Sequence, residues 1–348
     1  MIGLFVATLV AVPMQKLQYP QTRKADIEDV YFGTKVPDPY RWLEDTESPE
    51  TKAWIEAQNK VTFGYLGAIK EREPIKRRLT KLWNYEKFQT PFQKGGRYFY
   101  RKNSGIQNQY VIYVAEALNA PGRVLLDPNK LSKDGTIAVG SLSVSDDGKY
   151  LAYSVQNGGS DWQEWRVRDV DTGQDLKDRI SWSKFSGASW SADGKGFYYS
   201  RYDAPKGAEL QEQNYYQKLY YHRVGQPQSR DALVYERRDQ KEWGFDGTVT
   251  DDGRFLIISV WKGTEPKNQV FYKDLSKPRS NVVELVTGFD ASYGFIANTG
   301  ERLLFLTDKN APLGKIIEIN ARTGRRANVV AENRSNLESA SVVGGRLF

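Results

Sequence analysis

Few side chains in this sequence could support covalent chemistry. Cysteine is absent, which excludes thiolate nucleophiles, iron–sulfur clusters and cysteine-ligated zinc, and His222 is the sole histidine. A single histidine cannot build a histidine-rich metal site and would have to serve as the base of any Ser-His-Asp triad. His222 lies inside an expected strand, so we interpret it as a structural histidine rather than as a catalytic base.

No recognised catalytic or cofactor motif accompanies this histidine. The strings nearest to a G-x-S-x-G nucleophile elbow, Gly158-Gly159-Ser160-Asp161 and Phe185-Ser186-Gly187, lack the flanking glycines that expose the serine. Phosphate-binding loops, dinucleotide fingerprints, EF-hand loops and H-E-x-x-H motifs are missing as well. We therefore expect no cofactor, no metal site and no self-sufficient active site.

Aromatic and carboxylate residues in loops are the remaining candidates for binding. Asp161 stands beside Trp162 in a glycine-rich loop, Phe185 ends the Trp182–Phe185 run, and Trp243 precedes Gly244 and Phe245. Each of these aromatic residues could contact a ligand or pack between structural units. The residues alone leave both roles open.

Composition and charge exclude several classes of partner. The chain has 348 residues, with 50 Lys plus Arg against 43 Asp plus Glu for a net charge of +7, and the two signs are interleaved. This pattern indicates a solvated surface and no nucleic-acid footprint. The segment from Lys70 to Lys87 is the one basic run, and we interpret it as a wet helix face.

The first residues resemble a targeting segment. Ile2–Val12 is an apolar run of eleven residues. A helix needs about 20 residues to span a bilayer, so this run is too short, but its length fits the core of a signal peptide. A basic leader and a small-x-small cleavage site are missing, so we favour a signal that starts upstream of Met1 over a structural strand. Residues 1–18 are expected to be signal-like or disordered, and the periplasm is favoured over the cytoplasm.

Residues 19–84 predict a helical segment. Two prolines at 37 and 39 delay helix formation until a short turn after Pro39. Ser48 then offers an N-cap with Pro49 at the first helical position, and a second helix is expected over Pro74–Trp83. The apolar face that carries Trp54, Val61 and Tyr65 needs a partner surface, and its exposure would promote association.

Residues 85–348 show an internal repeat. A glycine turn followed by a charged residue and a β-rich strand recurs every 45 to 59 residues, at Gly96, Gly148, Gly194, Gly253, Gly300 and Gly345. Two further short strands follow in most units. Repeats of 40 to 50 residues with about four strands each predict a β-propeller rather than a long β-sandwich. Five units are complete and a sixth begins, so we expect the chain to be part of a longer product.

Several strings in register resemble the prolyl oligopeptidase family. They are Val36-Pro37-Asp38-Pro39-Tyr40-Arg41-Trp42-Leu43-Glu44-Asp45, Glu56-Ala57-Gln58-Asn59-Lys60, Gly159-Ser160-Asp161-Trp162, Asp193-Gly194-Lys195-Gly196-Phe197-Tyr198-Tyr199 and Lys218-Leu219-Tyr220-Tyr221-His222. The resemblance implies a mainly β fold, with five blades and the start of a sixth of an expected seven. It also implies that the helical segment belongs to a C-terminal α/β-hydrolase domain, which would carry the catalytic triad and is absent from this chain.

The resemblance implies a serine peptidase that cuts short peptides after proline, with the propeller gating access. By position, Phe185 matches a pocket phenylalanine and Asp161 matches an aspartate that faces the hydrolase domain. Pocket side chains are also implied near Trp243 and Thr264, where Gly244 departs from the bulkier residue of the pattern.

Three functional readings follow from these observations. The first is the N-terminal part of a prolyl oligopeptidase, inactive alone, with proline-containing peptides and the missing hydrolase domain as partners. The second is the related oligopeptidase that cuts after Arg or Lys. The third is a stand-alone binding propeller, which predicts a closed ring.

Overall fold

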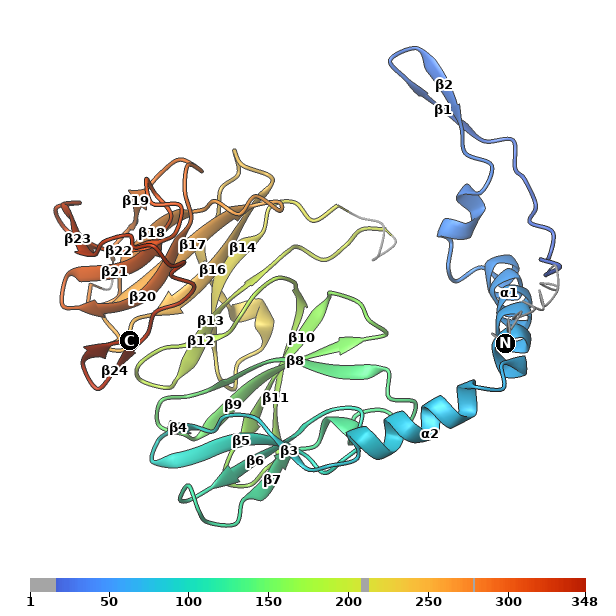
Figure 1. The fold of residues 1–348 in the computed structure, drawn as a ribbon. Helices are drawn as coiled ribbons and strands as arrows, with labels where there is room; N and C mark the ends of the chain where they lie inside the picture. The colour runs from blue at the N-terminus through green and yellow to red at the C-terminus, as the bar shows by residue number, and fades with distance from the viewer. Residues whose placement is uncertain (1–16, 208–212, 278) are drawn as a thin grey trace, which may run out of the picture. The chain divides into compact units, whose positions relative to one another are not determined.

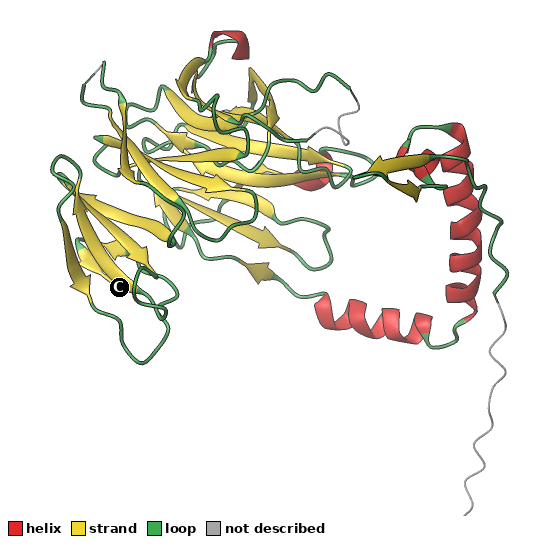
Figure 2. Cartoon of the chain, turned by 90° about the horizontal axis from the view of Figure 1, so that it is seen from above, coloured by secondary structure: helices red, strands yellow, loops and turns green. Residues whose placement is uncertain are grey.

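The computed structural model describes residues 17–207, 213–277 and 279–348. The chain divides into two compact units, residues 1–85 and residues 86–348. Both α-helices of the described residues belong to the first unit, whereas strands dominate the second; Figure 2 draws helices in red and strands in yellow. The apolar run Ile2–Val12 lies outside the described residues. Among the residues that are described, no helix is long and apolar enough to cross a membrane.

The first unit contains the helices that the sequence predicts. A 3-10 turn η1 (Arg41–Glu44) precedes α1 (Pro49–Ala68) and α2 (Arg72–Trp83). Ser48 caps α1, since its hydroxyl accepts the Thr51 N–H at 3.1 Å. Helix α2 begins two residues before the predicted Pro74, because proline is tolerated in the first turn of a helix.

A hairpin of β1 (Glu28–Tyr31) and β2 (Thr34–Pro37) interrupts the segment that we expected to be helical. Phe32 and Gly33 both have positive φ, at 52° and 84°, as a two-residue hairpin turn of the primed type requires. No Asn-Gly or Asp-Gly signal marks this turn, which explains why the sequence does not reveal it. The Arg41 guanidinium binds the Asp29 and Asp38 carboxylates and ties the hairpin to η1.

Both helices keep much of their apolar surface in contact with solvent. Thr51 is the single buried residue of α1, Trp54 and Val61 are half-buried, and Tyr65 is exposed. Helix α2 buries no residue. It presents one exposed apolar face made of Ile75, Leu79, Leu82 and Trp83. Of the α1 face that we expected to be exposed, only Tyr65 is exposed, whereas the apolar face of α2 was not predicted.

The second unit is built from antiparallel sheets that follow one another in chain order (Figure 1). We divide the strands β3 to β23 into five groups, called blades 1 to 5. Blade 1 comprises β3 (Lys87–Phe88), β4 (Phe92–Lys94), β5 (Arg97–Asn103), β6 (Val111–Ala115) and β7 (Arg123–Leu126). Blade 2 comprises β8 (Ile137–Val144), β9 (Tyr150–Asn157), β10 (Gln163–Asp169) and β11 (Asp175–Ser183).

The remaining blades repeat this plan. Blade 3 comprises β12 (Ser189–Trp190), β13 (Gly196–Arg201), β14 (Lys218–Arg223) and β15 (Ala232–Tyr235). Blade 4 comprises β16 (Trp243–Val249), β17 (Phe255–Lys262), β18 (Gln269–Asp274) and β19 (Val282–Val286). Blade 5 comprises β20 (Tyr293–Thr299), β21 (Arg302–Thr307), β22 (Lys315–Asn320) and β23 (Arg326–Val330), and a hairpin of β24 (Val342–Val343) and β25 (Arg346–Leu347) follows it. Short 3-10 turns η2 (Pro128–Lys130) and η3 (Gln228–Arg230) lie in the connections.

The glycine turns predicted from the repeat join β4 to β5 in blade 1 and the first two strands in each of blades 2 to 5. At three of them a Ser or Thr hydroxyl donates to an Asp two residues later, and that carboxylate accepts the N–H of the residue after the glycine. The three sets are Ser145, Asp147 and Lys149; Ser191, Asp193 and Lys195; and Thr250, Asp252 and Arg254. The intervening glycines have φ between +65° and +72°, where a side chain would be strained.

Hydrophobic cores lie between neighbouring blades rather than at one centre. Phe255, Leu303 and Ile319 belong to one cluster shared by blades 4 and 5, and Phe99, Leu125 and Tyr153 belong to one shared by blades 1 and 2. Blades 2 and 3 form one continuous sheet, because β11 pairs with β13 at a single position. Packed apolar side chains therefore join each of these pairs of blades.

Candidate functional site

Loops at one end of the blades carry the residues singled out from the sequence. Successive antiparallel strands reverse direction, so the loops after the second and the fourth strands of each blade emerge at the same end. Asp161 follows β9, Phe185 follows β11, and Thr264 follows β17. Trp243 begins β16 at this end as well.

A line of aromatic rings crosses this end, and we call it the aromatic row. Trp162 meets both Trp182 and Tyr202 edge-on, with ring centroids 5.8 and 6.0 Å apart. Phe185 meets Trp261 at 6.0 Å and an interplanar angle of 87°. Lys184 joins the two groups, because its Nζ lies 4.9 Å from the Trp162 centroid and 5.4 Å from that of Phe185.

Phe185 has a strained backbone conformation in this position. Trp182 and Phe185 have φ of 65° and 55°, in the left-handed region that non-glycine residues rarely adopt. Half of the Phe185 side chain nevertheless remains exposed to solvent. A strained and exposed aromatic residue persists only where its surroundings fix it, and such positions concentrate at binding sites.

Hydrogen bonds to residues of blades 3 and 4 fix the connection that carries Phe185. Gln217, which is buried, donates to the Lys184 carbonyl at 2.8 Å and accepts the Phe245 N–H at 2.6 Å. The Ser186 hydroxyl accepts the Ser200 N–H at 2.7 Å. The connection between β11 and β12 is thereby tied to β13, β14 and β16.

Asp246 holds the same connection from blade 4. Its Oδ1 accepts the Gly187 N–H at 3.3 Å. Burial raises the pKa of the Asp246 carboxyl, and the Gly187 N–H opposes that rise only in part. The group therefore gains little stabilisation of its charged form at this position.

Gly244 makes room for Trp261, with which it pairs across β16 and β17. A Cβ on Gly244 would overlap three carbons of the Trp261 indole, the farthest of them at 2.6 Å. The glycine that departs from the family pattern is thus matched by a tryptophan on the facing strand. The ring of Trp261, rather than a side chain at position 244, contributes to the row.

The three residues expected at the site are not all brought together. Phe185 lies in the aromatic row, and Asp161 is exposed next to Trp162. Trp243 points to the other face of β16, where its ring meets Phe289 at 5.5 Å and Phe271 at 6.4 Å. Contact of these residues with a ligand stays a prediction.

Trp261, Tyr202 and Lys184 were not identified from the sequence as members of this site. Their signal is weak but present: Lys184 and Tyr202 follow strand ends at the predicted binding edge, and Trp261 is the second-last residue of β17. The pairing of Trp261 with Gly244 needs the strand register, which the sequence does not give.

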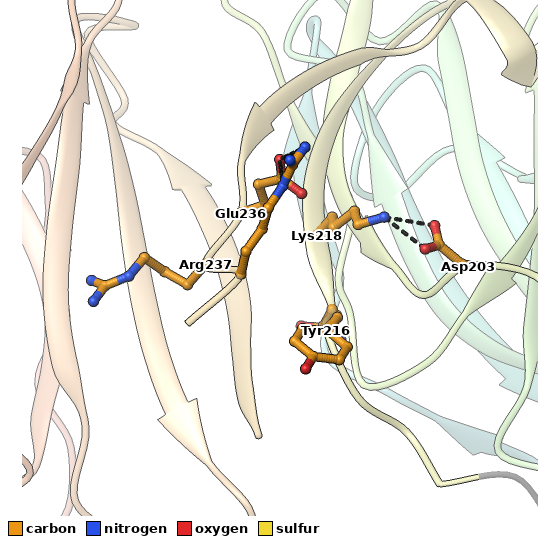
Figure 3. A pocket seen from close by; sticks show the side chains of 7 residues that line it. Asp203, Tyr216, Lys218, Glu236 and Arg237 are labelled. Carbon is orange, nitrogen blue, oxygen red and sulfur yellow. Dashed lines mark hydrogen bonds and ion pairs between the residues drawn. The ribbon is translucent and has the colours of Figure 1, made fainter. Parts of the chain in front are cut away.

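A charged pocket of about 370 Å³ opens at the same end, between the loops that follow β13 and β15 (Figure 3). Lys218 donates to both carboxylate oxygens of Asp203 at 2.8 and 2.7 Å, and Arg238 pairs with Glu236 at 2.8 Å. Figure 3 shows Arg237 pointing away from Lys218. Lys218 and Arg238 are paired within the pocket and Arg237 pairs with Asp239 and Glu284, so the pocket carries no strong preference for one sign of ligand.

The described residues contain no catalytic constellation. His222 is fully buried, and both of its ring nitrogens contact carboxylates, of Asp178 and Asp231, rather than a serine hydroxyl. This geometry supports a structural histidine. Across residues 17–207, 213–277 and 279–348, no group of three or more His, Cys, Asp or Glu side chains could hold a metal ion.

Comparisons with known proteins agree with this architecture. Residues 19–348 match the family model described as "Prolyl oligopeptidase, N-terminal beta-propeller domain". The chain is 38% identical to a prolyl endopeptidase from Elizabethkingia meningoseptica, over 95% of this chain and 47% of that protein. It is 32% identical to a dual function macrocyclase-peptidase POPB from Amanita bisporigera, over 90% of this chain and 47% of that protein.

Solved structures show the same likeness. Prolyl oligopeptidase B from Galerina marginata, bound to a 25mer macrocyclization substrate, superposes with a TM-score of 0.83 at 29% identity. The superposition covers 93% of this chain and 49% of that one. The chain spans about half the length of the curated relatives it matches. With its five blades and a family match over residues 19–348, the chain belongs to the prolyl oligopeptidase family, of which it comprises the N-terminal β-propeller domain.

Proposed function

We propose that this chain is the N-terminal and propeller part of a serine-type prolyl oligopeptidase that hydrolyses short peptides on the carboxyl side of proline. The aromatic row carries this proposal. Aromatic-lined surfaces bind proline-containing segments by packing rings against the pyrrolidine face. Phe185, strained and half exposed beside Trp261, offers such a surface at the end of the blades.

In this proposal the chain does not catalyse alone. Its one histidine is buried between two carboxylates, so an α/β-hydrolase domain would have to supply the nucleophile and the base. The exposed apolar face of α2 supports a partner of this kind, because such faces are normally covered by another surface. The propeller would then gate access of peptides to the triad of that domain.

Several of the curated matches are named prolyl endopeptidases or prolyl oligopeptidases, and these names favour specificity for proline over specificity for basic residues. A periplasmic location is proposed only from the apolar run Ile2–Val12. Cell fractionation with sequencing of the mature N-terminus tests it: an uncleaved cytoplasmic chain would contradict the location without affecting the proposed activity.

Two measurements on the purified chain test the main proposal. A Gly-Pro chromogenic peptide should not be hydrolysed, and hydrolysis that a serine-directed inhibitor blocks would show an active site in the chain itself. A proline-containing peptide should quench tryptophan fluorescence, and Phe185→Ala should weaken this binding by about tenfold or more. Phe92→Ala, which removes a comparably exposed phenylalanine from β4, is the matched control and should bind normally. Equal binding by both variants would refute a role for the aromatic row.

A further inference from the structure

A buried cluster of ionisable groups joins blades 2 and 3 away from the aromatic row. His222 on β14 contacts the Asp178 carboxylate through Nε2 at 2.9 Å and the Asp231 carboxylate through Nδ1 at 2.7 Å. None of the three side chains is more than 1% exposed. Asp178 belongs to β11 of blade 2, whereas Asp231 directly precedes β15 of blade 3.

The carboxylates of Asp178 and Asp231 also accept hydrogen bonds from groups other than His222. The Tyr199 hydroxyl donates to the second oxygen of Asp231 at 2.7 Å, and the Gly225 N–H donates to Asp178 Oδ1 at 2.6 Å. The other oxygen of Asp178 is buried and has no hydrogen-bond partner. Asp178, Asp231 and, behind Asp231, Tyr199 are the titratable groups that face the ring.

This geometry requires two N–H donors on the ring. A neutral imidazole has one donor and one acceptor, and the acceptor nitrogen would place its lone pair against a carboxylate that only accepts. The imidazolium donates to both carboxylates, and it also compensates buried negative charge that would otherwise be unpaired. The contacts therefore select the charged ring.

The cluster lies where few backbone hydrogen bonds join blades 2 and 3. Strands β11 and β13 pair at a single position, Ser183 with Arg201. The amide of Gln228 makes a second link, since it exchanges two hydrogen bonds of 3.0 Å with the backbone of Ser181. Side chains, not a strand ladder, hold the middle of β11 against blade 3.

We propose that His222 is held as an imidazolium that latches blade 2 to blade 3 through Asp178 and Asp231, and that loss of its proton at alkaline pH loosens this seam. Deprotonation transfers one N–H proton to solvent and leaves two carboxylates buried beside a neutral ring. Strand β11 leads directly into Lys184 and Phe185, so loosening the seam would disturb the aromatic row.

The expected direction with pH follows from the contacts. Burial alone would lower the pKa of His222, but the hydrogen bonds and charges of Asp178 and Asp231 outweigh burial and raise the pKa to about 9. A raised pKa adds stability that is complete below the unfolded value of about 6.5 and is lost as the pH rises through about 9. Between pH 7 and pH 10 the contribution of His222 to the folding equilibrium constant should fall roughly 70-fold.

Because His222 is the sole histidine, NMR of the untagged chain with labelled imidazole isolates it. We expect a single imidazole signal that titrates near pH 9, with nitrogen shifts of an imidazolium at pH 7. A midpoint at or below 6.5, or a neutral ring at pH 7, would overturn the proposal. Asp178→Asn should lower the midpoint by one unit or more, and an unchanged midpoint in the folded variant would also overturn it. If that variant does not fold, the wild-type titration still decides.

Hydrogen exchange tests the seam itself. After correction for the intrinsic rate, amides of β11 and the Gly225 N–H should lose protection between pH 7 and pH 9.5. The ladder of β21 and β22 in blade 5 is the internal control, because it carries no histidine. Equal loss of protection in both regions, or none in β11, would contradict a latch at this seam.

Discussion

Replacement of Gly244 by alanine tests whether the Trp261 ring can occupy its position only because Gly244 has no side chain. The new Cβ would overlap the indole, with Cη2 only 2.6 Å away, whereas carbon atoms in contact prefer 3.5 to 4.0 Å. Hydrogen-bonded pairing along the whole of β16 and β17 prevents the backbone from retreating. The indole must therefore move by about 1 Å or more and lose its edge-on contact with Phe185.

The free-energy change combines two opposing effects. Overpacking of this kind costs about 1–3 kcal/mol, whereas alanine is favoured over glycine inside a strand by roughly 0.5–1 kcal/mol. We expect Gly244→Ala to lower the free energy of unfolding by about 0.5–2 kcal/mol. In a Trp261→Ala background the overlap is gone, so the same substitution should stabilise the protein by about 0.5–1 kcal/mol.

Urea unfolding of the four proteins in this double-mutant cycle gives the coupling energy directly. A coupling of about 1–3 kcal/mol is expected. Gly294→Ala is the matched control, since Gly294 lies on β20 of blade 5 and its Cβ would meet only the Leu306 carbonyl oxygen, at 3.9 Å. If Gly244→Ala is tolerated as well as Gly294→Ala and shows no coupling to Trp261, the argument from overlap is wrong.

Three further substitutions probe other parts of the chain. In urea unfolding, Phe185→Gly should have a free energy of unfolding about 1 kcal/mol higher than Phe185→Ala, because glycine relieves the left-handed φ of 55°. Equal free energies of unfolding would show that this residue is not strained. Asp193→Ala should cost about 0.5–1.5 kcal/mol at pH 7 through its turn hydrogen bonds. The Ser191 hydrogen bond lowers the pKa of Asp193, so that cost should shrink as the pH falls below 3.8, and a cost that is the same at low pH would contradict this. Leu79→Glu, on the exposed face of α2, should reduce association in light scattering, whereas Thr62→Glu on α1 should not; identical association would show that this face is not responsible.

The repeat was predictable because its signals are local. An Asp-Gly turn such as Asp193-Gly194 fixes where two strands meet, and the Asp carboxylate makes its bonds within two residues of itself. Short-range chemistry of this kind is legible in a single sequence. The helix that begins at Pro49 was predicted for the same reason, since its cap residue is adjacent.

The parts that escaped prediction depend on contacts between residues far apart in the chain. The first strand of each blade, such as β16, has no preceding glycine turn, and β11 was not recognised because its polar residues Asp178 and Arg179 interrupt the apolar pattern. The buried position of Asp178 is explained only by its contact with His222, 44 residues later in the chain. The hairpin at Phe32-Gly33 was missed because phenylalanine is an unusual residue at positive φ.

The same dependence explains why the candidate site could be named but not built from the sequence. Phe185 reaches its position through Gln217, whose one amide bonds both the Lys184 carbonyl and the Phe245 N–H, and those partners lie 33 and 28 residues away. Removing either bond would leave a buried polar group unsatisfied, so the row and the packing between blades cannot be changed independently. A surface that is shaped by three blades can be retuned by substitutions inside any of them, as the exchange of bulk between Gly244 and Trp261 illustrates. If the aromatic row binds peptides as proposed, its specificity should follow from how the blades pack as much as from which side chains face the peptide.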